Sequence, residues 1–260
     1  MTLAHSPRFE VRLAATDQEI QAAQHLRYKV FVQELGSDGD LVDHDAQLER
    51  DRFDPFYDHL LLYDLARDAL PQDQVVGVYR LMPGDRAVGA GGFYTAGEYD
   101  LSPLIESGRP LLELGRSCLH RDYRGGVAMH VIWSALAEYI LARGIEILFG
   151  TASFHGTDIA GLTPQLSLLH HRHLAPPDLR VRALAQHYQP MDLMAEAAID
   201  RPAAMRAVPA LIKGYLRLGG FVGDGAFIDH AFNTTDICLV LDTARMNDRQ
   251  RAIYTRGGAA

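Results

Sequence analysis

Glu113 and Arg116 are the residues whose types and spacing best suit acid–base chemistry. Glu113 lies within a leucine-rich apolar run over 111–119 that predicts a buried strand. Burial raises the pKa of a carboxyl group toward neutrality, which is what a general base working near pH 7 needs. Arg116 is close enough in the sequence to orient this carboxylate or to bind a carboxylate of a ligand. The alternative is that Glu113 and Arg116 form a structural ion pair with Arg80.

A loop rich in arginine and glycine follows this strand and precedes a predicted helix. Its sequence is RDYRGG, and its candidate binding residues are Arg121, Arg124, Gly125 and Gly126. Guanidinium groups bind phosphate through paired hydrogen bonds, and the free N–H groups of a helix N-terminus favour anions. The loop has neither the Lys-Ser/Thr of a Walker loop nor the glycine spacing of a dinucleotide-binding loop. It therefore predicts another kind of phosphate site, with an ordinary strand-to-helix turn as the alternative.

Charge is unevenly distributed along the chain. Residues 34–68 contain eleven acids and three arginines, whereas residues 170–217 contain seven lysines and arginines and four acids. This division suits a cationic small molecule on one surface and an anionic partner on another, with solvated faces as the alternative. The net charge of -8 argues against nucleic-acid binding, which needs a basic surface.

Three neighbouring histidines, His170, His171 and His173, raise the question of a metal site. No acid accompanies them at ligand spacing in the sequence. Adjacent histidines on a helix are expected to point apart. The sequence therefore predicts no metal site.

Alternating strands and helices carry these candidate residues. A capping box from Thr16 to Glu19 predicts a helix that runs to about Gln33. After the RDYRGG loop, a helix should end at Gly144 and a short buried strand should follow at 145–149. Further elements are predicted as strands at 59–65, at 75–81, around Phe227 and at 237–241, and as a helix between Pro209 and Gly219.

Length and composition favour one globular domain. The chain has 260 residues, 48% of them hydrophobic, and we expect a single domain over 1–248 and a flexible tail over 249–260. Cys118 and Cys238 lie in apolar runs typical of buried thiols in a reducing compartment. Because the first residues do not form a leader and no run is long enough to span a membrane, we expect a cytoplasmic protein or one attached to the inner membrane surface.

The succession of strand, RDYRGG loop and amphipathic helix resembles the acyl-donor site of the GNAT acyltransferase superfamily. In that family the loop holds the phosphates of coenzyme A or of a phosphopantetheine arm. The resemblance implies a GNAT-like α/β fold, with a central mixed β-sheet flanked by helices, and a phosphopantetheine site in the loop. The loop departs from the usual family pattern Q/R-x-x-G-x-G/A, which leaves room for a carrier protein as the acyl donor.

Four other motifs resemble the acyl-homoserine-lactone synthases, a branch of the same superfamily. They are RYKVF (27–31), ERDRFD (49–54), GVYRLMP (77–83) and ELGR (113–116). The tryptophan expected after the first motif is absent. The resemblance implies catalytic roles for Glu113 and Arg116. The residues that it assigns to the amino-acid substrate or its structural support are Arg27, Phe31, Asp51, Asp54 and Arg80.

Three later segments resemble the ornithine-acyl-carrier-protein N-acyltransferases, which make lyso-ornithine lipid. They are ASFHGTD (152–158), LIKGYLRLG (211–219) and DHAFNTTD (229–236). The resemblance implies transfer of a 3-hydroxyacyl chain to the α-amine of L-ornithine from acyl carrier protein. That partner would bring the thioester on its 4′-phosphopantetheine arm, so no tightly bound cofactor is expected.

The chemistry of this reaction assigns roles to the acidic residues. An amine must be neutral to attack a thioester, so Glu113 is expected to remove its proton. Asp51 and Asp54, with Asp45 and Glu49 nearby, are expected to attract the side-chain ammonium of ornithine. The alternatives are N-acylation of lysine, glutamine or glycine, acyl-homoserine-lactone synthesis, and a non-catalytic module that binds acyl carrier protein or lipid.

Overall fold

The structure is a computed structural model that describes residues 6–39 and 41–250. The chain divides into two compact units. Among the described residues, the first comprises those up to Ala90 together with Leu114–Gly144, and the second comprises Gly91–Glu113 together with those from Ile145 to Gln250. The expectation of one domain over 1–248 stays a prediction, and most of the expected tail, 251–260, lies outside the described residues.

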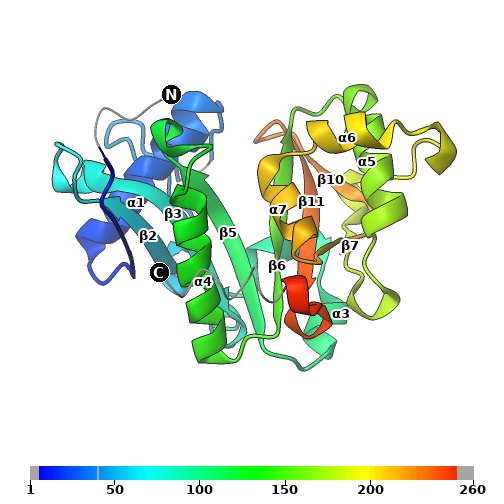
Figure 1. The fold of residues 1–260 in the computed structure, drawn as a ribbon, viewed down its shortest axis with the longest axis horizontal. Helices are drawn as coiled ribbons and strands as arrows, with labels where there is room; N and C mark the ends of the chain where they lie inside the picture. The colour runs from blue at the N-terminus through cyan, green and yellow to red at the C-terminus, as the bar shows by residue number, and fades with distance from the viewer. Residues whose placement is uncertain (1–5, 40, 251–260) are drawn as a thin grey trace. The chain divides into compact units, whose positions relative to one another are not determined.

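Strands β1 (Phe9–Leu13), β2 (Asp58–Asp64), β3 (Val75–Pro83) and most of β5 (Leu111–Leu119) form the sheet of the first unit, in that order (Figure 1). The pairs β1–β2 and β2–β3 are antiparallel. The predicted strands at 59–65, 75–81 and 111–119 are thereby confirmed.

Two helices cover opposite faces of this sheet. Helix α1 (Asp17–Arg27) begins at the predicted capping box and continues as a π-helical segment, Tyr28–Glu34. Its apolar side chains pack in one core cluster with Val78 of β3. The neighbouring Gly77 faces helix α4 (Ala128–Arg143), because a Cβ added there would lie 2.6 Å from Cδ1 of Ile132. Successive strand residues point to opposite faces, so α1 and α4 enclose the sheet from two sides.

The second unit is built on a mixed sheet. Its order is β5, β6 (Ile147–His155), β11 (Thr234–Asp242), β10 (Ala226–Asp229) and β8 (Tyr188–Gln189), and β9 (Phe221–Val222) also pairs with β11. Leu111–Glu113 of β5 pairs with β6 in parallel, whereas the pairs β6–β11, β11–β10, β10–β8 and β11–β9 are antiparallel. Strand β6 begins two residues later than predicted and runs to His155, because it pairs with β11 along nine residues.

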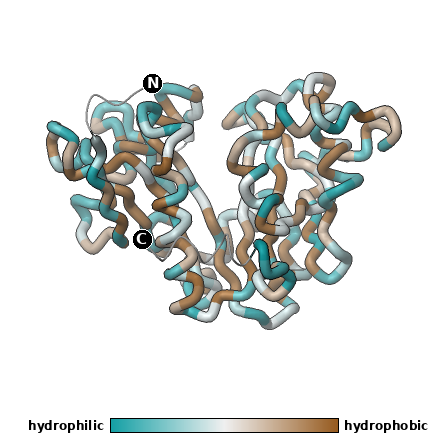
Figure 2. Tube along the Cα trace, in the orientation of Figure 1, coloured by the Kyte–Doolittle hydropathy of each residue, from teal (hydrophilic) through white to brown (hydrophobic). Residues whose placement is uncertain are grey.

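The helices of the second unit are α3 (Ser102–Glu106), α5 (Ile159–His173), α6 (Arg201–Ala207) and α7 (Ala210–Arg217), and a small second sheet pairs β4 (Tyr99–Asp100) with β7 (Arg182–Ala183). A one-turn helix, α2 (Gly84–Ala87), belongs to the first unit. Hydrophobic residues concentrate on the strands of both units, and hydrophilic ones on the connecting segments (Figure 2). The expected α/β fold with helices beside a mixed sheet is confirmed. Within the described residues, no helix combines the length and the apolar character needed to cross a bilayer.

Candidate active site

A buried network of alternating charges occupies the first unit. Its members are three arginines and three acids, namely Arg27, Arg80, Arg116, Glu49, Asp51 and Asp54. Arg27, at the end of α1, has no exposed surface. Its Nε donates to Glu49, and its Nη1 and Nη2 donate to the two oxygens of Asp54 at 2.7 and 3.3 Å. Gln24, one turn earlier, donates to Asp54 at 2.9 Å.

Arg80 of β3 is the second fully buried arginine. Its Nη1 donates to Asp51 at 2.8 Å and to Asp54 at 2.6 Å. Its guanidinium carbon lies 4.3 Å from the centre of the Tyr57 ring, a cation–π contact. The remaining groups, Nε and Nη2, are buried and have no hydrogen-bond partner among the described residues.

Arg116 of β5 completes the network. Its Nε donates to Glu49 at 3.1 Å, and its Nη2 lies 3.4 Å from Asp51. The residue adopts φ 49°, a left-handed conformation that is uncommon outside glycine. The sequence-based alternative of a structural ion pair is thus realised in part, because Arg116 and Arg80 share Asp51.

Mutual pairing shifts the pKa values of this network. Burial alone would raise the pKa values of Glu49, Asp51 and Asp54, but the neighbouring arginines outweigh burial and hold all three below their ordinary values. Burial alone would lower the pKa of Arg27, and the carboxylates of Glu49 and Asp54 raise it instead. All four groups are therefore charged at neutral pH.

A cavity of about 740 Å³ opens beside this network. Its lining includes four aspartates, Asp43, Asp45, Asp51 and Asp54, and a single arginine, Arg50. Arg50 is paired with Asp43 at 2.8 Å. The sequence assigned the attraction of an ammonium group first to Asp51 and Asp54, but the structure pairs both with arginines. Within the described residues, Asp45 alone of these four acids makes no hydrogen bond or ion pair.

Glu113 lies in the second unit and is 1% exposed. Its carboxylate accepts the backbone N–H groups of Tyr94 and Thr95 at 3.0 and 2.6 Å. These donors are backbone groups about twenty residues away in the chain, so no side-chain motif in the sequence predicted them. They fix both oxygens of the predicted base, whose role stays a prediction.

Phe31 lies on the π-helical segment and packs against the apolar cluster beneath α1. The sequence predicted that Phe31 would contact the amino-acid substrate or support the fold around it, and this position fits the second of these roles. Its side chain contributes to the core of the first unit rather than to the lining of the cavity.

The RDYRGG loop joins β5 to α4 as predicted. The side chain of Arg121 is 72% exposed, and Arg124 pairs with Glu34 at 2.8 Å while its Nε donates to the carbonyl oxygen of Leu119. Gly125 adopts φ 77°, and an added Cβ would meet nothing within 4 Å, so conformation rather than space selects glycine there.

Val127 caps α4 without a side-chain hydrogen bond, which leaves the first N–H groups of the helix available to an anion. Gly126 precedes this cap, and its added Cβ would touch only the Tyr123 carbonyl oxygen, at 3.9 Å.

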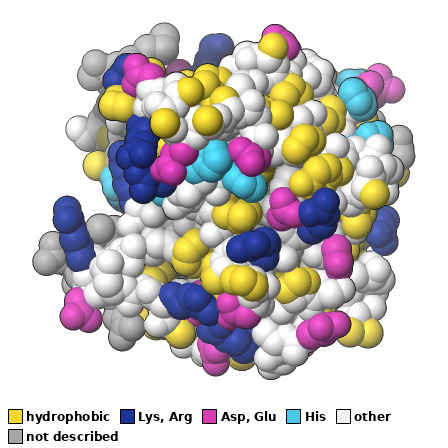
Figure 3. All heavy atoms as spheres, turned by 90° about the vertical axis from the view of Figure 1, so that its right-hand side faces the viewer, with side chains coloured by type: hydrophobic (Ala, Val, Ile, Leu, Met, Phe, Trp, Pro, Cys, Tyr) yellow, Lys and Arg dark blue, Asp and Glu magenta, His cyan; other side chains and the backbone are white. Residues whose placement is uncertain are grey.

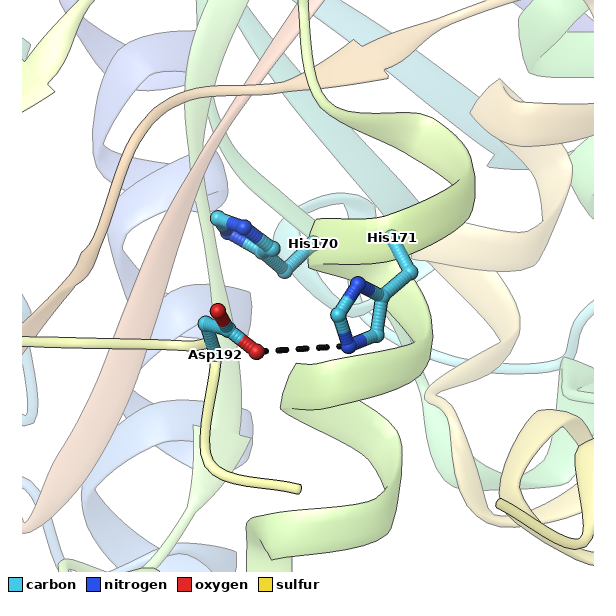
Figure 4. A group of neighbouring side chains, drawn as sticks. All are labelled: His170, His171 and Asp192. Carbon is cyan, nitrogen blue, oxygen red and sulfur yellow. Dashed lines mark ion pairs between the residues drawn. The ribbon is translucent and has the colours of Figure 1, made fainter. Parts of the chain in front are cut away.

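The histidine cluster of the second unit differs from expectation. His170 and His171 lie with Asp192 so that one ligand atom from each is within 4.8 Å of the others (Figure 4). The prediction that the two histidines point apart is therefore wrong. Asp192 is 21 residues from His171 in the sequence, so ligand spacing did not reveal it.

Comparisons with known proteins agree with this architecture. An acetyltransferase (GNAT) domain model matches residues 26–134. The fold is similar to that of the N-acyl amino acid synthase FeeM from uncultured soil microbes, with a TM-score of 0.53, 13% identity and coverage of 92% of this chain and 93% of that one. It is also similar to the CoA-dependent acyl-homoserine lactone synthase BjaI, with a TM-score of 0.53, 14% identity and coverage of 96% and 90%.

Curated relatives are much more similar in sequence. The L-ornithine N(alpha)-acyltransferase of Rhodobacter capsulatus is 58% identical over 95% of both chains. The protein of the same name from Brucella abortus is 46% identical over 94% of this chain and 88% of that one. Identity at this level over nearly the full length places the chain in the family of L-ornithine N(alpha)-acyltransferases, within the GNAT acyltransferases.

Proposed function

We propose that this enzyme transfers a 3-hydroxyacyl chain from acyl carrier protein to the α-amine of L-ornithine, the first step of ornithine lipid synthesis. The observation that carries the acceptor is the acidic cavity, in which Asp45 has no partner among the residues that the structure describes, while Asp51 and Asp54 are held by arginines. An unpaired carboxylate at the wall of a cavity suits a substrate with an ammonium group on its side chain.

The donor half of the proposal rests on the RDYRGG loop. Exposed Arg121, the available N–H groups of α4 and the left-handed Gly125 form a surface suited to a phosphate diester. A 4′-phosphopantetheine arm carries such a phosphate, so the donor binds during turnover and no resident cofactor is needed. We place the reaction at the cytoplasmic surface of the inner membrane, where the acylated product would partition.

The proposed reaction is a direct acyl transfer. The α-nitrogen attacks the thioester carbonyl, the C–N bond forms, and the C–S bond breaks. Glu113 takes the proton that the α-ammonium must lose before the attack. The nitrogen loses a second proton as it becomes an amide, and the departing thiolate takes up that proton to become the thiol. The attack needs no covalent enzyme intermediate.

Release of carrier thiol from 3-hydroxyacyl carrier protein tests this function. We expect release to require L-ornithine, with the N-acylated product identified by mass spectrometry, and to collapse in Glu113→Gln. If only lysine, glutamine or glycine supported release, that amino acid and not ornithine would be the acceptor. No release with any amine would overturn acyl transfer in favour of a binding module.

The role of Asp45 has a sharper test. Norvaline has the carbon skeleton of ornithine without its side-chain ammonium. We expect Asp45→Asn to lower kcat/KM for ornithine about 10-fold, which corresponds to one charge-assisted hydrogen bond, and to leave the low rate with norvaline unchanged. Asp68→Asn is the control, because Asp68 is exposed and forms no hydrogen bond or ion pair with a described residue. Equal losses with both substrates would show that Asp45 does not contact the side chain.

A further inference from the structure

The second unit contains a cluster of metal-binding side chains that takes no part in the proposed acyl transfer. His170 and His171 lie near the end of α5, and Asp192 lies in the segment that follows β8. Nε2 of His171 is 3.3 Å from Oδ1 of Asp192. As Figure 4 shows, both rings extend from the helix toward the carboxylate. Histidine side chains also lie beside acidic ones on the face of this unit seen in Figure 3.

The segment that carries Asp192 is fixed against α5 by other contacts. The buried Oγ of Ser167 accepts the backbone N–H groups of Leu193 and Met194 at 3.1 and 3.2 Å. The two Ser167 bonds hold the Asp192 carboxylate in front of the histidines without an ion. Nε2 of His171 is also 3.0 Å from the carbonyl oxygen of Met194, and this nitrogen would exchange that contact for the ion on binding.

His170 supplies an unused ligand. Its Nδ1 is buried without a hydrogen-bond partner, and no hydrogen bond joins either ring nitrogen to another described residue. A buried polar atom without a partner costs free energy, and coordination of an ion by an imidazole nitrogen is one way in which proteins satisfy it. The adjacent charge of Arg172 is engaged elsewhere, because its Nε lies 2.7 Å from Glu196.

We propose that His170, His171 and Asp192 bind a divalent transition-metal ion such as Zn²⁺. Two imidazoles and one carboxylate are ligands that zinc accepts, and water completes such a site where the ligands reach the surface. Two ligands about 2 Å from a tetrahedral ion are about 3.3 Å apart, which is the separation of the His171 and Asp192 atoms. The carboxylate of Asp192 is 60% exposed, so an ion can enter from solvent.

Bound metal would cross-link the end of α5 to the segment after β8. Because the ion would bind the folded unit and not the unfolded chain, it should raise the unfolding temperature. The site contains none of the residues that line the acidic cavity or form the RDYRGG loop. Its test is therefore independent of the proposed function.

Zinc titration of the metal-free, full-length protein tests the site. We expect the parent to bind one equivalent more than His171→Ala or Asp192→Ala in calorimetry at micromolar zinc. His173→Ala is the matched control, because His173 lies on the same helix but outside the cluster, and it should bind as the parent does. Cobalt substitution should give visible absorption in the parent that both ligand variants lack.

Two results would overturn the proposal. One is the same zinc stoichiometry in the parent and in both ligand variants, and the other is no zinc binding by the parent in the micromolar range. Asp192→Ala removes a largely exposed side chain, so it should retain the fold, which circular dichroism would verify. If either result were obtained, a structural hydrogen bond from His171 to the Asp192 segment would account for the cluster.

Discussion

Arg27 and Arg80 donate to the same oxygen of Asp54, at 2.7 and 2.6 Å. One arginine comes from the end of α1 and the other from β3, so a single carboxylate joins a helix to the sheet that it covers. Because both guanidinium groups are fully buried, neither can replace this partner with water.

Asp54→Asn should therefore destabilise the first unit strongly. The substitution keeps the shape of the side chain but removes the charge that two buried arginines require. Loss of one partner from a buried ion pair costs about 3–5 kcal/mol, measurable by urea denaturation. The exposed Asp68→Asn should change the free energy of unfolding by no more than about 0.5 kcal/mol. A similar small change for Asp54→Asn would mean that the network contributes little to folding.

The same network predicts the response to acid. The pKa values of Glu49, Asp51 and Asp54 are lower in the folded chain than their ordinary values of 4.5, 3.8 and 3.8. As the pH falls, the unfolded chain binds protons first, so the stabilisation is complete above those ordinary values and is lost below them. Denaturation measured from pH 7 to pH 3 should show this loss. The free energy of unfolding should fall less steeply with falling pH in Asp54→Asn than in the parent. Equal slopes would contradict the conclusion that the folded chain lowers the pKa of Asp54.

Gly77→Ala should disturb the contact between β3 and α4. The added methyl group would lie 2.6 Å from Cδ1 of Ile132 and 2.8 Å from Cδ2 of Leu119. Overpacking of this kind costs about 1–3 kcal/mol. Ile132→Val removes the nearer methyl group, so the double variant should recover part of the loss in urea denaturation. Gly97→Ala, whose added Cβ meets nothing within 4 Å, serves as the control.

Arg206 and Arg217 are the residues to test for docking of acyl carrier protein. Of the bases in the positive stretch 170–217, Arg172, Arg182 and Arg201 are paired with acids, whereas Arg206 and Arg217 are exposed and form no ion pair with a described residue. Arg206→Glu combined with Arg217→Glu should raise KM for the acyl carrier protein roughly 10-fold at low salt, with KM for ornithine unchanged. A rise that persists at high salt would argue against an electrostatic contact.

Local patterns predicted the elements that carry the candidate residues. The capping box at Thr16, the positive-φ glycine at 144 and the leucine-rich strand over 111–119 each act over a few residues, and each appears as expected. The exception is β6, which extends to His155 because Thr234 and its neighbours in β11 pair with it. That pairing depends on a segment about eighty residues away.

Partners of the charged residues were harder to predict. Sequence motifs marked Arg27, Asp54 and Arg80 but did not show that the two arginines would pair with Asp54. Nor did they show that Asp45 would line the cavity without an ion pair to a described residue. Likewise, Asp192 joins His171 only because the chain folds back onto α5. Contacts between distant segments follow from tertiary packing, and spacing along one sequence does not encode them directly.

Each unit encloses one cysteine, Cys118 in the first and Cys238 in the second, and both thiols are buried. Burial raises the pKa of Cys118 to about 12, and it raises the pKa of Cys238 well above its ordinary value. A thiol that is neither ionised nor accessible reacts slowly with aromatic disulfides. The folded enzyme should therefore contribute almost no signal of its own when such a reagent is used to measure the carrier thiol released by acyl transfer. Slow labelling of Cys118 and Cys238 would report the opening of the first and the second unit separately.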